Sequence, residues 1–275
     1  MSNANSFPMR RYLCLACALA VLPLAGQAQQ TEPQAPASLF GDETDVNLGL
    51  GATFSPRYLG ARQTRVSPEL ELSISRGIFF ADTLRGIGAE YLTDSGFYVS
   101  GALSYDPGRK EKESTWRPGS KRLRGMGEVK GATTADLLVS QRITSWLAIN
   151  GEAEFRVAGY ERGNRYRLGL EGTVLRDGGD TLTLGVNMHA GDGRYNRTYF
   201  GVSEEQQRNS RFSRFNAQSG IYAYSASIDW QHDFDRNWTL FMGVNLMEFS
   251  DRAHHSPLVE GNTGVTGFAM VNYTF

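Results

Sequence analysis

Cysteine is almost absent from this sequence, and both copies, Cys14 and Cys17, lie in an apolar stretch near the N-terminus. Neither sign of charge is in excess, because 28 Lys and Arg stand against 29 Asp and Glu. A chain so balanced has no general electrostatic attraction for nucleic acid. Beyond the N-terminal stretch, no apolar run approaches the roughly 20 residues that a membrane helix needs. These absences argue against a disulfide-rich scaffold, a general nucleic-acid binder and a helical membrane protein.

The N-terminus has the layout of a signal peptide. Arg10 and Arg11 precede an apolar stretch over residues 12–24, and small residues follow up to Ala28. We expect residues 1–28 to be removed, which leaves no cysteine and 26 basic against 29 acidic residues. Residues 29–44 are rich in Gln, Pro and acids without periodicity, so we expect them to form an N-terminal tail.

The last twelve residues alternate strictly between two faces. Apolar and aromatic residues, ending with Val271, Tyr273 and Phe275, share one face, and polar residues such as Asn272 take the other. One interpretation is an edge strand of a soluble sandwich. The other is the closing strand of an outer-membrane barrel, in which Val271, Tyr273 and Phe275 resemble the signal that the barrel-assembly machinery reads.

The same period of two recurs along the chain from residue 45. Its clearest case is 146–158, where Leu147, Ile149 and Phe155 oppose Asn150 and Glu152. The pattern predicts about twelve strands, although the short pair over 77–92 leaves a ten-stranded wall open. The expected strands are 45–55, 65–75, 77–82, 86–92, 96–105, 133–142, 146–158, 165–176, 181–190, 221–231, 238–247 and 264–275.

The connections between these strands alternate in length. Short links (93–95, 143–145, 177–180 and 233–237) alternate with long segments (106–132, 191–220 and 249–263). Outer-membrane barrels have short periplasmic turns and long external loops, whereas a jelly roll with unequal ends would imitate only part of this parity. We therefore predict an all-β fold, a single antiparallel transmembrane β-barrel over residues 45–275. The tail over 29–44 would be periplasmic, and the barrel would lie in the outer membrane of a Gram-negative bacterium.

A charged group at the bilayer midplane costs on the order of 2–4 kcal/mol, so charges within the strands should face the lumen. Acids and bases on neighbouring strands would then pair across the ladder and favour a filled interior, although twelve strands can also leave a narrow channel. The predicted lumen-facing charges are Glu152, Glu154, Arg156, Arg165, Arg167 and Glu171.

Four histidines raise the question of an enzyme. His189 is expected on a lumen face, His232 at the periplasmic end of a strand, and His254 and His255 beside Ser256 in an external loop. Ser256 lacks the sequence context of a nucleophile elbow, and neighbours in a loop do not by themselves form a triad. No His, Cys, Asp and Glu spacing typical of a metal site occurs either. We expect no catalytic residue, no metal site and no cofactor.

A basic segment lies in the first long loop. Residues 109–124 carry seven basic and two acidic side chains around Trp116. An external loop of this kind meets lipopolysaccharide, whose phosphates suit Arg and Lys; the alternative is a mobile, solvated loop. The candidate lipopolysaccharide contacts are Arg109, Lys110, Lys112, Arg117, Lys121, Arg122 and Arg124.

Three loop stretches and the last strand resemble one family. They are the segment from Gly49 to Tyr58, with Ser55-Pro56 and Tyr58-Leu59-Gly60, then Tyr199-Phe200-Gly201-Val202-Ser203 and Ser256-Pro257-Leu258-Val259, followed by the aromatic C-terminal strand. In this order they resemble the MltA-interacting protein (MipA) and OmpV family of outer-membrane barrels. The resemblance implies the fold and location, and a non-enzymatic scaffold that brings a lytic transglycosylase together with a murein synthase in peptidoglycan remodelling. A small-solute channel or a surface adhesin is the alternative, and outer-membrane lipid is expected around the barrel in either case.

Overall fold

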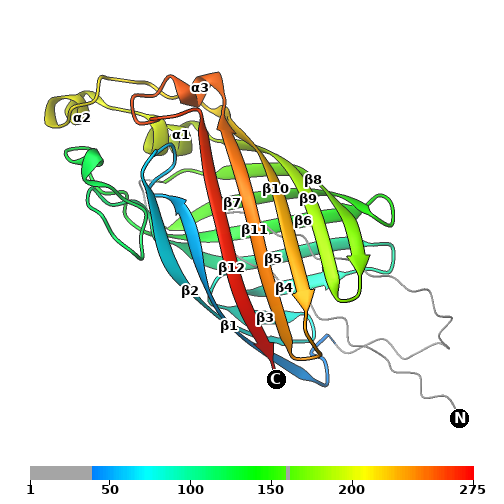
Figure 1. The fold of residues 1–275 in the computed structure, drawn as a ribbon. Helices are drawn as coiled ribbons and strands as arrows, with labels where there is room; N and C mark the ends of the chain where they lie inside the picture. The colour runs from blue at the N-terminus through cyan, green and yellow to red at the C-terminus, as the bar shows by residue number, and fades with distance from the viewer. Residues whose placement is uncertain (1–38, 159–161) are drawn as a thin grey trace, which may run out of the picture.

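The computed structural model of this protein is described here for residues 39–158 and 162–275, and it is a closed antiparallel barrel (Figure 1). Each strand pairs with its neighbours in sequence, and β1 pairs with β12 to close the ring. The strands are β1 (Thr44–Pro56), β2 (Thr64–Arg76), β3 (Phe79–Asp82), β4 (Gly86–Leu92), β5 (Phe97–Asp106), β6 (Ala132–Arg142), β7 (Leu147–Ala158), β8 (Arg165–Asp177), β9 (Asp180–Gly191), β10 (Gly220–Asp233), β11 (Trp238–Phe249) and β12 (Thr263–Thr274).

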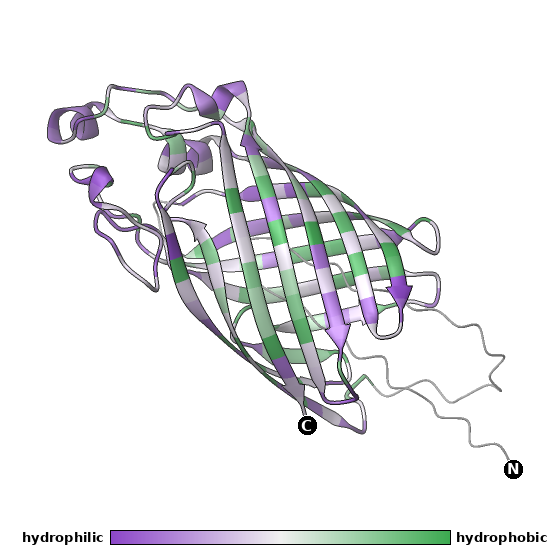
Figure 2. Cartoon of the chain, in the orientation of Figure 1, coloured by the Kyte–Doolittle hydropathy of each residue, from purple (hydrophilic) through white to green (hydrophobic). Residues whose placement is uncertain are grey.

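Twelve strands form the wall, which confirms the predicted fold and decides against ten. Side chains alternate along each strand, so that Leu50, Leu70 and Ile228 are exposed on the outside while Glu71, Asn150 and Asn272 are buried inside. The outside therefore carries an apolar band, and Figure 2 shows hydrophobic and hydrophilic residues interspersed along the strands. No helix in the described part of the chain has the length and apolarity to cross a membrane. The predicted signal peptide and most of the predicted tail lie outside the described residues.

One side chain of β10 lies on the opposite face from the one that the sequence alternation predicts. The alternation predicts Tyr222 and Tyr224 on the same outer face, but Tyr222 is 4% exposed and Tyr224 is 50% exposed. The register between β9 and β10 shifts between Ile221 and Ala223. Such a bulge places one extra residue in the ladder, here Tyr222, and turns its side chain to the opposite face. Tyr222 therefore faces inward.

The two ends of the barrel differ. We call the end that carries the short links and the C-terminus the turn end, and the opposite end the loop end (Figure 1). At the loop end lie three short α-helices, α1 (Gly193–Phe200), α2 (Glu204–Asn209) and α3 (Asp251–His254), and the 3-10 turn Lys121–Leu123. Asp192 and Ser203 cap the first two helices with their side chains.

One hairpin of the wall is short. β3 pairs with β2 only over Ser73–Arg76, and the last pair between β4 and β5 is Ile87 with Leu103. The tip of this hairpin, residues 83–85, turns into the barrel, where Leu84 packs against Phe241 and Met270. The wall is thus complete at the turn end, but two of its strands stop short of the loop end.

Candidate functional site

Four loop segments fold over the mouth at the loop end, and we call them the cap: residues 57–63, 107–131, 192–219 and 250–262. They bury two apolar clusters that contact each other through Phe215. Leu258 and Phe200 are among the most deeply buried residues of the protein, at 0% and 1% exposure. The cluster residues are Tyr58, Ala61, Leu123, Met126, Val202, Phe212 and Leu258 in one group and Tyr195, Phe200, Ala217, Tyr222, Ala223, Phe249 and Ala253 in the other.

Hydrogen bonds join the loop motifs that the sequence analysis singled out. The Tyr58 hydroxyl lies 3.1 Å from the Leu258 carbonyl oxygen and 2.9 Å from Glu260 Oε1. Burial, followed by the Glu260 carboxylate, raises the pKa of Tyr58, so its hydroxyl stays protonated and able to donate. Ser256 Oγ donates to the Phe200 carbonyl at 2.5 Å. Hydrogen bonds between residues 56 to 202 positions apart in sequence therefore hold the cap together.

The motif glycine Gly60 adds a close backbone approach. Its φ is +93°, a conformation that L side chains rarely adopt. Its carbonyl accepts a hydrogen bond from the Glu260 backbone at 2.8 Å, and a Cβ at this position would lie 2.9 Å from the Val259 side chain. The motif residues that carry the family resemblance thus act in packing the cap.

Beneath the cap lies an ion-pair cluster centred on Arg162. This side chain is 3% exposed, its Nε lies 2.6 Å from Asp106 Oδ2, and it also pairs with Glu154. Burial by itself lowers the pKa of Arg162, but the carboxylates of Asp106 and Glu154 outweigh burial and raise it. Arg162 is therefore a permanent cation that joins the segment between β7 and β8 to β5 and β7 beneath the cap. The Tyr199 hydroxyl, 3.0 Å from Asp106 Oδ2, adds α1 to this cluster.

Further polar pairs fill the lumen toward the turn end. Arg167 lies 3.2 Å from Glu152, and His189 lies 2.9 Å from Ser225. Lower down, Arg85 from the hairpin tip pairs with Glu90 at 2.6 Å and stacks 4.0 Å above the Phe80 ring. Asn272 donates to Glu71 at 2.7 Å. Charged and polar groups thus pair at these points of the interior.

The predicted lumen-facing charges lie as follows. Glu154 and Arg167 are buried inside the barrel, while Glu152, Arg156, Arg165 and Glu171 are half-buried on the same face as them. Glu154 forms ion pairs with both Arg162 and Arg165. Arg165 Nη2 lies 2.6 Å from Glu154 Oε2. Sequence reasoning missed Arg162, Asp106, Arg85 and Glu90. A lone arginine in a loop gives no periodic signal, so only the fold brings Arg162 to Glu154.

The basic loop 107–131 packs into the cap, and part of it is buried. Leu123 is 1% exposed and Met126 is 2% exposed. Arg109 is 3% exposed and donates to the Tyr199 carbonyl, so it is not available to a lipid phosphate, and burial lowers its pKa. Three of the other six candidate contacts have partners within the protein: Arg117 donates to the Pro107 carbonyl, Arg122 pairs with Glu260, and Lys110 pairs with Glu128. The remaining three, Lys112, Lys121 and Arg124, are exposed.

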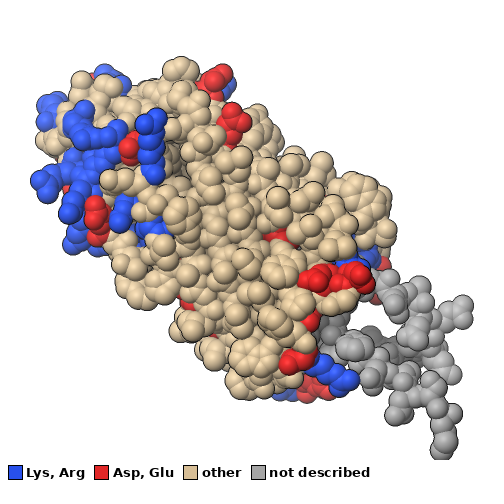
Figure 3. All heavy atoms as spheres, viewed as in Figure 1, with Lys and Arg blue, Asp and Glu red and all other residues tan. Residues whose placement is uncertain are grey.

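Charge separates between the two ends. Lys and Arg gather over the cap in Figure 3, where loop 107–131 alone holds eight basic and three acidic residues. At the turn end the exposed acids are Asp42, Glu43, Asp45, Asp94, Asp177, Asp233 and Asp235. Aromatic side chains surround them: Trp238 and Phe275 each contact the Tyr273 ring, with centroids 4.9 Å apart. The Phe275 ring is 70% exposed, and its backbone N–H bonds to the Val46 carbonyl.

The histidines are dispersed. His232 contacts Asp180 at 2.8 Å at the turn end, and His255 contacts the backbone of Asp251 in the cap. The Ser256 hydroxyl donates to the Phe200 carbonyl, and Ser256 lies in the buried part of the cap. Within the described ranges, no group of three or more His, Cys, Asp or Glu side chains could hold a metal ion.

A family model described as "MltA-interacting protein MipA" matches residues 48–275 of the chain. No curated protein matches the sequence.

Among solved structures, an outer membrane channel from Pseudomonas putida F1 is similar, with 11% identity and a TM-score of 0.47 over 90% of this chain and 100% of that chain. The translocator domain of the autotransporter NalP from Neisseria meningitidis matches with 10% identity and a TM-score of 0.41, over 86% and 89%. The KdgM porin in complex with oligogalacturonate matches with 11% identity and a TM-score of 0.38, over 84% and 99%. These values support no inference about function.

Proposed function

The chain belongs to the MipA family, and from this membership we propose that it is a non-enzymatic scaffold that holds a lytic transglycosylase and a murein synthase at the outer membrane. The protein is an outer-membrane β-barrel. The name of the family refers to an interaction with the transglycosylase MltA. The murein synthase is included as a partner because the resemblance to the MipA and OmpV family implies it.

One observation supports the scaffold best: the interior is occupied while the turn end is open to partners. The cap lies over the mouth, and ion pairs such as Arg162 with Asp106 lie below it. In barrels of this class the short turns face the periplasm, where murein lies. The turn end presents seven exposed acids against the exposed Arg76, Arg176 and Arg236, and this excess of negative charge suits a partner with a basic surface. We therefore infer that murein enzymes dock on the turn end.

Reversal of charge at the turn end tests this proposal. We expect the variant Asp42→Lys, Glu43→Lys, Asp94→Lys and Asp177→Lys to recover at least tenfold less transglycosylase and synthase in a crosslinked pull-down from native envelopes. The control reverses two exposed acids of the cap, Glu113→Lys and Glu205→Lys, and should recover both enzymes as the unmodified protein does. Equal recovery by the turn-end variant, or no murein enzyme with the unmodified protein, would contradict the scaffold.

The two alternatives make different predictions. A small-solute channel requires a continuous water path past the Arg162 cluster and past Leu84, which both lie inside the barrel. A surface adhesin would act through the basic cap, and deletion of residues 107–131 would abolish cell adhesion. The exposed Lys112, Lys121 and Arg124 are the side chains of that loop best placed to meet an anionic surface.

A further inference from the structure

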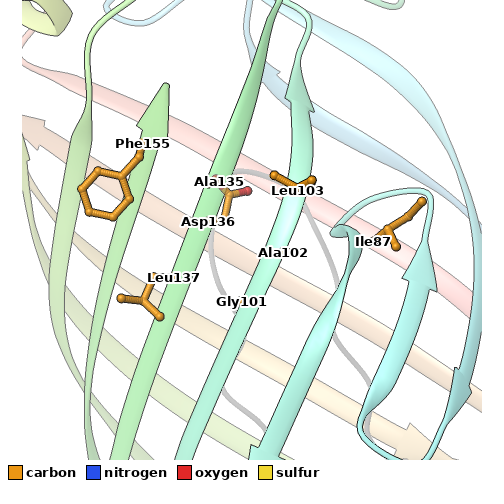
Figure 4. A pocket seen from close by; sticks show the side chains of 8 residues that line it. All are labelled: Ile87, Gly101, Ala102, Leu103, Ala135, Asp136, Leu137 and Phe155. Atoms are coloured by element: carbon orange, nitrogen blue, oxygen red, sulfur yellow. The ribbon is translucent and has the colours of Figure 1, made fainter. Parts of the chain in front are cut away.

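The short β3–β4 hairpin leaves an interruption in the barrel wall, which we call the wall window. It is bordered by β2 above Ser73, by the hairpin tip 83–85 and by β5 beyond Leu103. Within the described part of the chain, no strand continues the ladder between β2 and β5 above this hairpin. Figure 4 shows the hairpin ending near Ile87 while β5 and β6 continue past it. With two strands absent, β2 and β5 are separated by three sheet spacings, about 14 Å at ~4.8 Å each.

The exposed edge of β2 carries polar backbone groups. The Thr83 N–H donates to the Leu72 carbonyl. The Thr83 hydroxyl accepts a hydrogen bond from the Leu72 N–H and donates to the Leu70 carbonyl. Above Leu70, the groups that point to the same side belong to Pro68 and Val66, because alternate residues direct their backbone groups to one side of a strand. Pro68 has no N–H, which is how proline is tolerated at a sheet edge. A carbonyl without a partner is costly where a sheet edge meets hydrocarbon, so a polar occupant of the window is favoured.

An apolar hollow of about 310 Å³ begins at the same border. Ile87 and Leu103, the last pair of the β4–β5 ladder, form one side of it, and Leu137 and Phe155 form the other (Figure 4). Gly101 lies in its floor, and nothing lies within 4 Å of the position that a Cβ would take there. The hollow lies on the lipid-facing side, where Ile87 is 71% and Leu103 is 57% exposed.

The basic loop 107–131 forms the upper border of the window. Its Thr115 carbonyl accepts hydrogen bonds from Arg65 Nη1 and Ser67 Oγ of β2, each at 2.9 Å. Trp116, the next residue, is 72% exposed, and Lys112, three residues before Thr115 in the loop, is also exposed. Trp is enriched at the level of lipid headgroups, and Lys is a common partner of phosphate. Three features thus follow one another from the loop end toward the membrane centre. They are the cationic side chains of the basic loop, the polar backbone edge of β2 and the apolar hollow.

We propose that this arrangement is a binding site for one phosphorylated glycolipid of the lipid A type. An acyl chain lies in the hollow between Leu103 and Phe155, sugar hydroxyls donate to the β2 edge, and a phosphate contacts Lys112. A glycolipid fits because the loop half of the barrel spans the outer leaflet. Selectivity comes from the headgroup, since hydrocarbon gains little when it moves from lipid to an apolar groove. This site is independent of the proposed scaffold.

Filling the hollow tests the proposal. Purified full-length barrel, reconstituted with lipid A and phosphatidylglycerol and then extracted into mild detergent, should retain about one lipid A per barrel by native mass spectrometry. Gly101→Phe should lower the retained lipid A at least tenfold. The matched control is Gly151→Phe, because Gly151 also has open space before its Cβ position but does not line the hollow. Heat-dependent gel mobility checks that both variants fold.

The headgroup is tested separately with Lys112→Glu, for which we expect about a fivefold loss of retained lipid A with the hollow intact. Equal retention by Gly101→Phe and Gly151→Phe would overturn the site. Equal retention of phosphatidylglycerol and lipid A by the unmodified protein would overturn the assignment to a glycolipid and indicate bulk membrane lipid only.

Discussion

Substitution of Leu258 by alanine should open the cap without unfolding the barrel. Leu258 is 0% exposed and packs in the cluster of Tyr58, Leu123 and Phe212. Its neighbours in this cluster come from three different loops, so the cavity lies where the loops meet. The wall does not depend on this side chain, because its ladder is continuous from β5 through β12 to β1 and β2.

A buried Leu→Ala change costs about 2–5 kcal/mol. If about 3 kcal/mol of this falls on the closed cap, the equilibrium constant for local opening rises roughly 150-fold, because 1.4 kcal/mol is a factor of ten. Hydrogen exchange measures this opening directly. The amides of Val202 and Phe215, which bond to each other's carbonyls, should exchange roughly 150-fold faster. Amides of β7 and β8 should keep their protection.

The control is Leu246→Ala, because Leu246 is 48% exposed on the lipid-facing side of β11 and lies outside the cap clusters. It should leave the Val202 and Phe215 amides unchanged. Unchanged exchange of these amides in Leu258→Ala would refute the inference that the apolar clusters hold the cap closed. Faster exchange throughout β7 and β8 would show instead that cap and wall open as one unit.

Three further predictions concern other parts of the barrel. Arg162→Met leaves Asp106 without its arginine partner and leaves Glu154 with Arg165 alone, at a cost of about 3–5 kcal/mol, so heat-dependent gel mobility should change at a lower temperature. Neutralising both acids as well should restore much of the loss. Planar-bilayer recording of the unmodified protein should show no stable open steps; steps that disappear when Asn150 or Asn187 is replaced by a bulky residue would support a channel. Deletion of Phe275 should reduce the amount of folded barrel in the outer membrane, as cell fractionation would measure, whereas an undiminished yield would refute the assembly signal.

The strands could be predicted from the sequence because a barrel wall imposes a period of two on every segment. One face meets lipid and the other meets the lumen, so residues such as Leu147 and Glu152 alternate wherever a strand crosses. The alternation fails where the backbone is irregular. The bulge between Ile221 and Ala223 turns Tyr222 inward, and no change in composition marks that residue.

The loops could not be predicted in the same way. Their residues are polar on average, and a polar loop is expected to be solvated. The folded cap depends on a few apolar residues, among them Phe200 and Leu258, which are 58 positions apart in sequence. Their burial depends on how far the strands carry each loop around the ring, and that distance is not visible in local sequence.

The sequence by itself therefore determined the barrel, the short turns at one end and the long loops at the other, because these follow from local alternation and segment length. Only the tertiary structure decided that Arg162 pairs with Asp106 and Glu154, that the motif residues Tyr58, Phe200 and Leu258 close the mouth, and that the β3–β4 hairpin leaves a window below the basic loop. The physical reason is that ion pairs, apolar clusters and wall gaps form between segments far apart in the chain, and ring closure alone sets the distances between them.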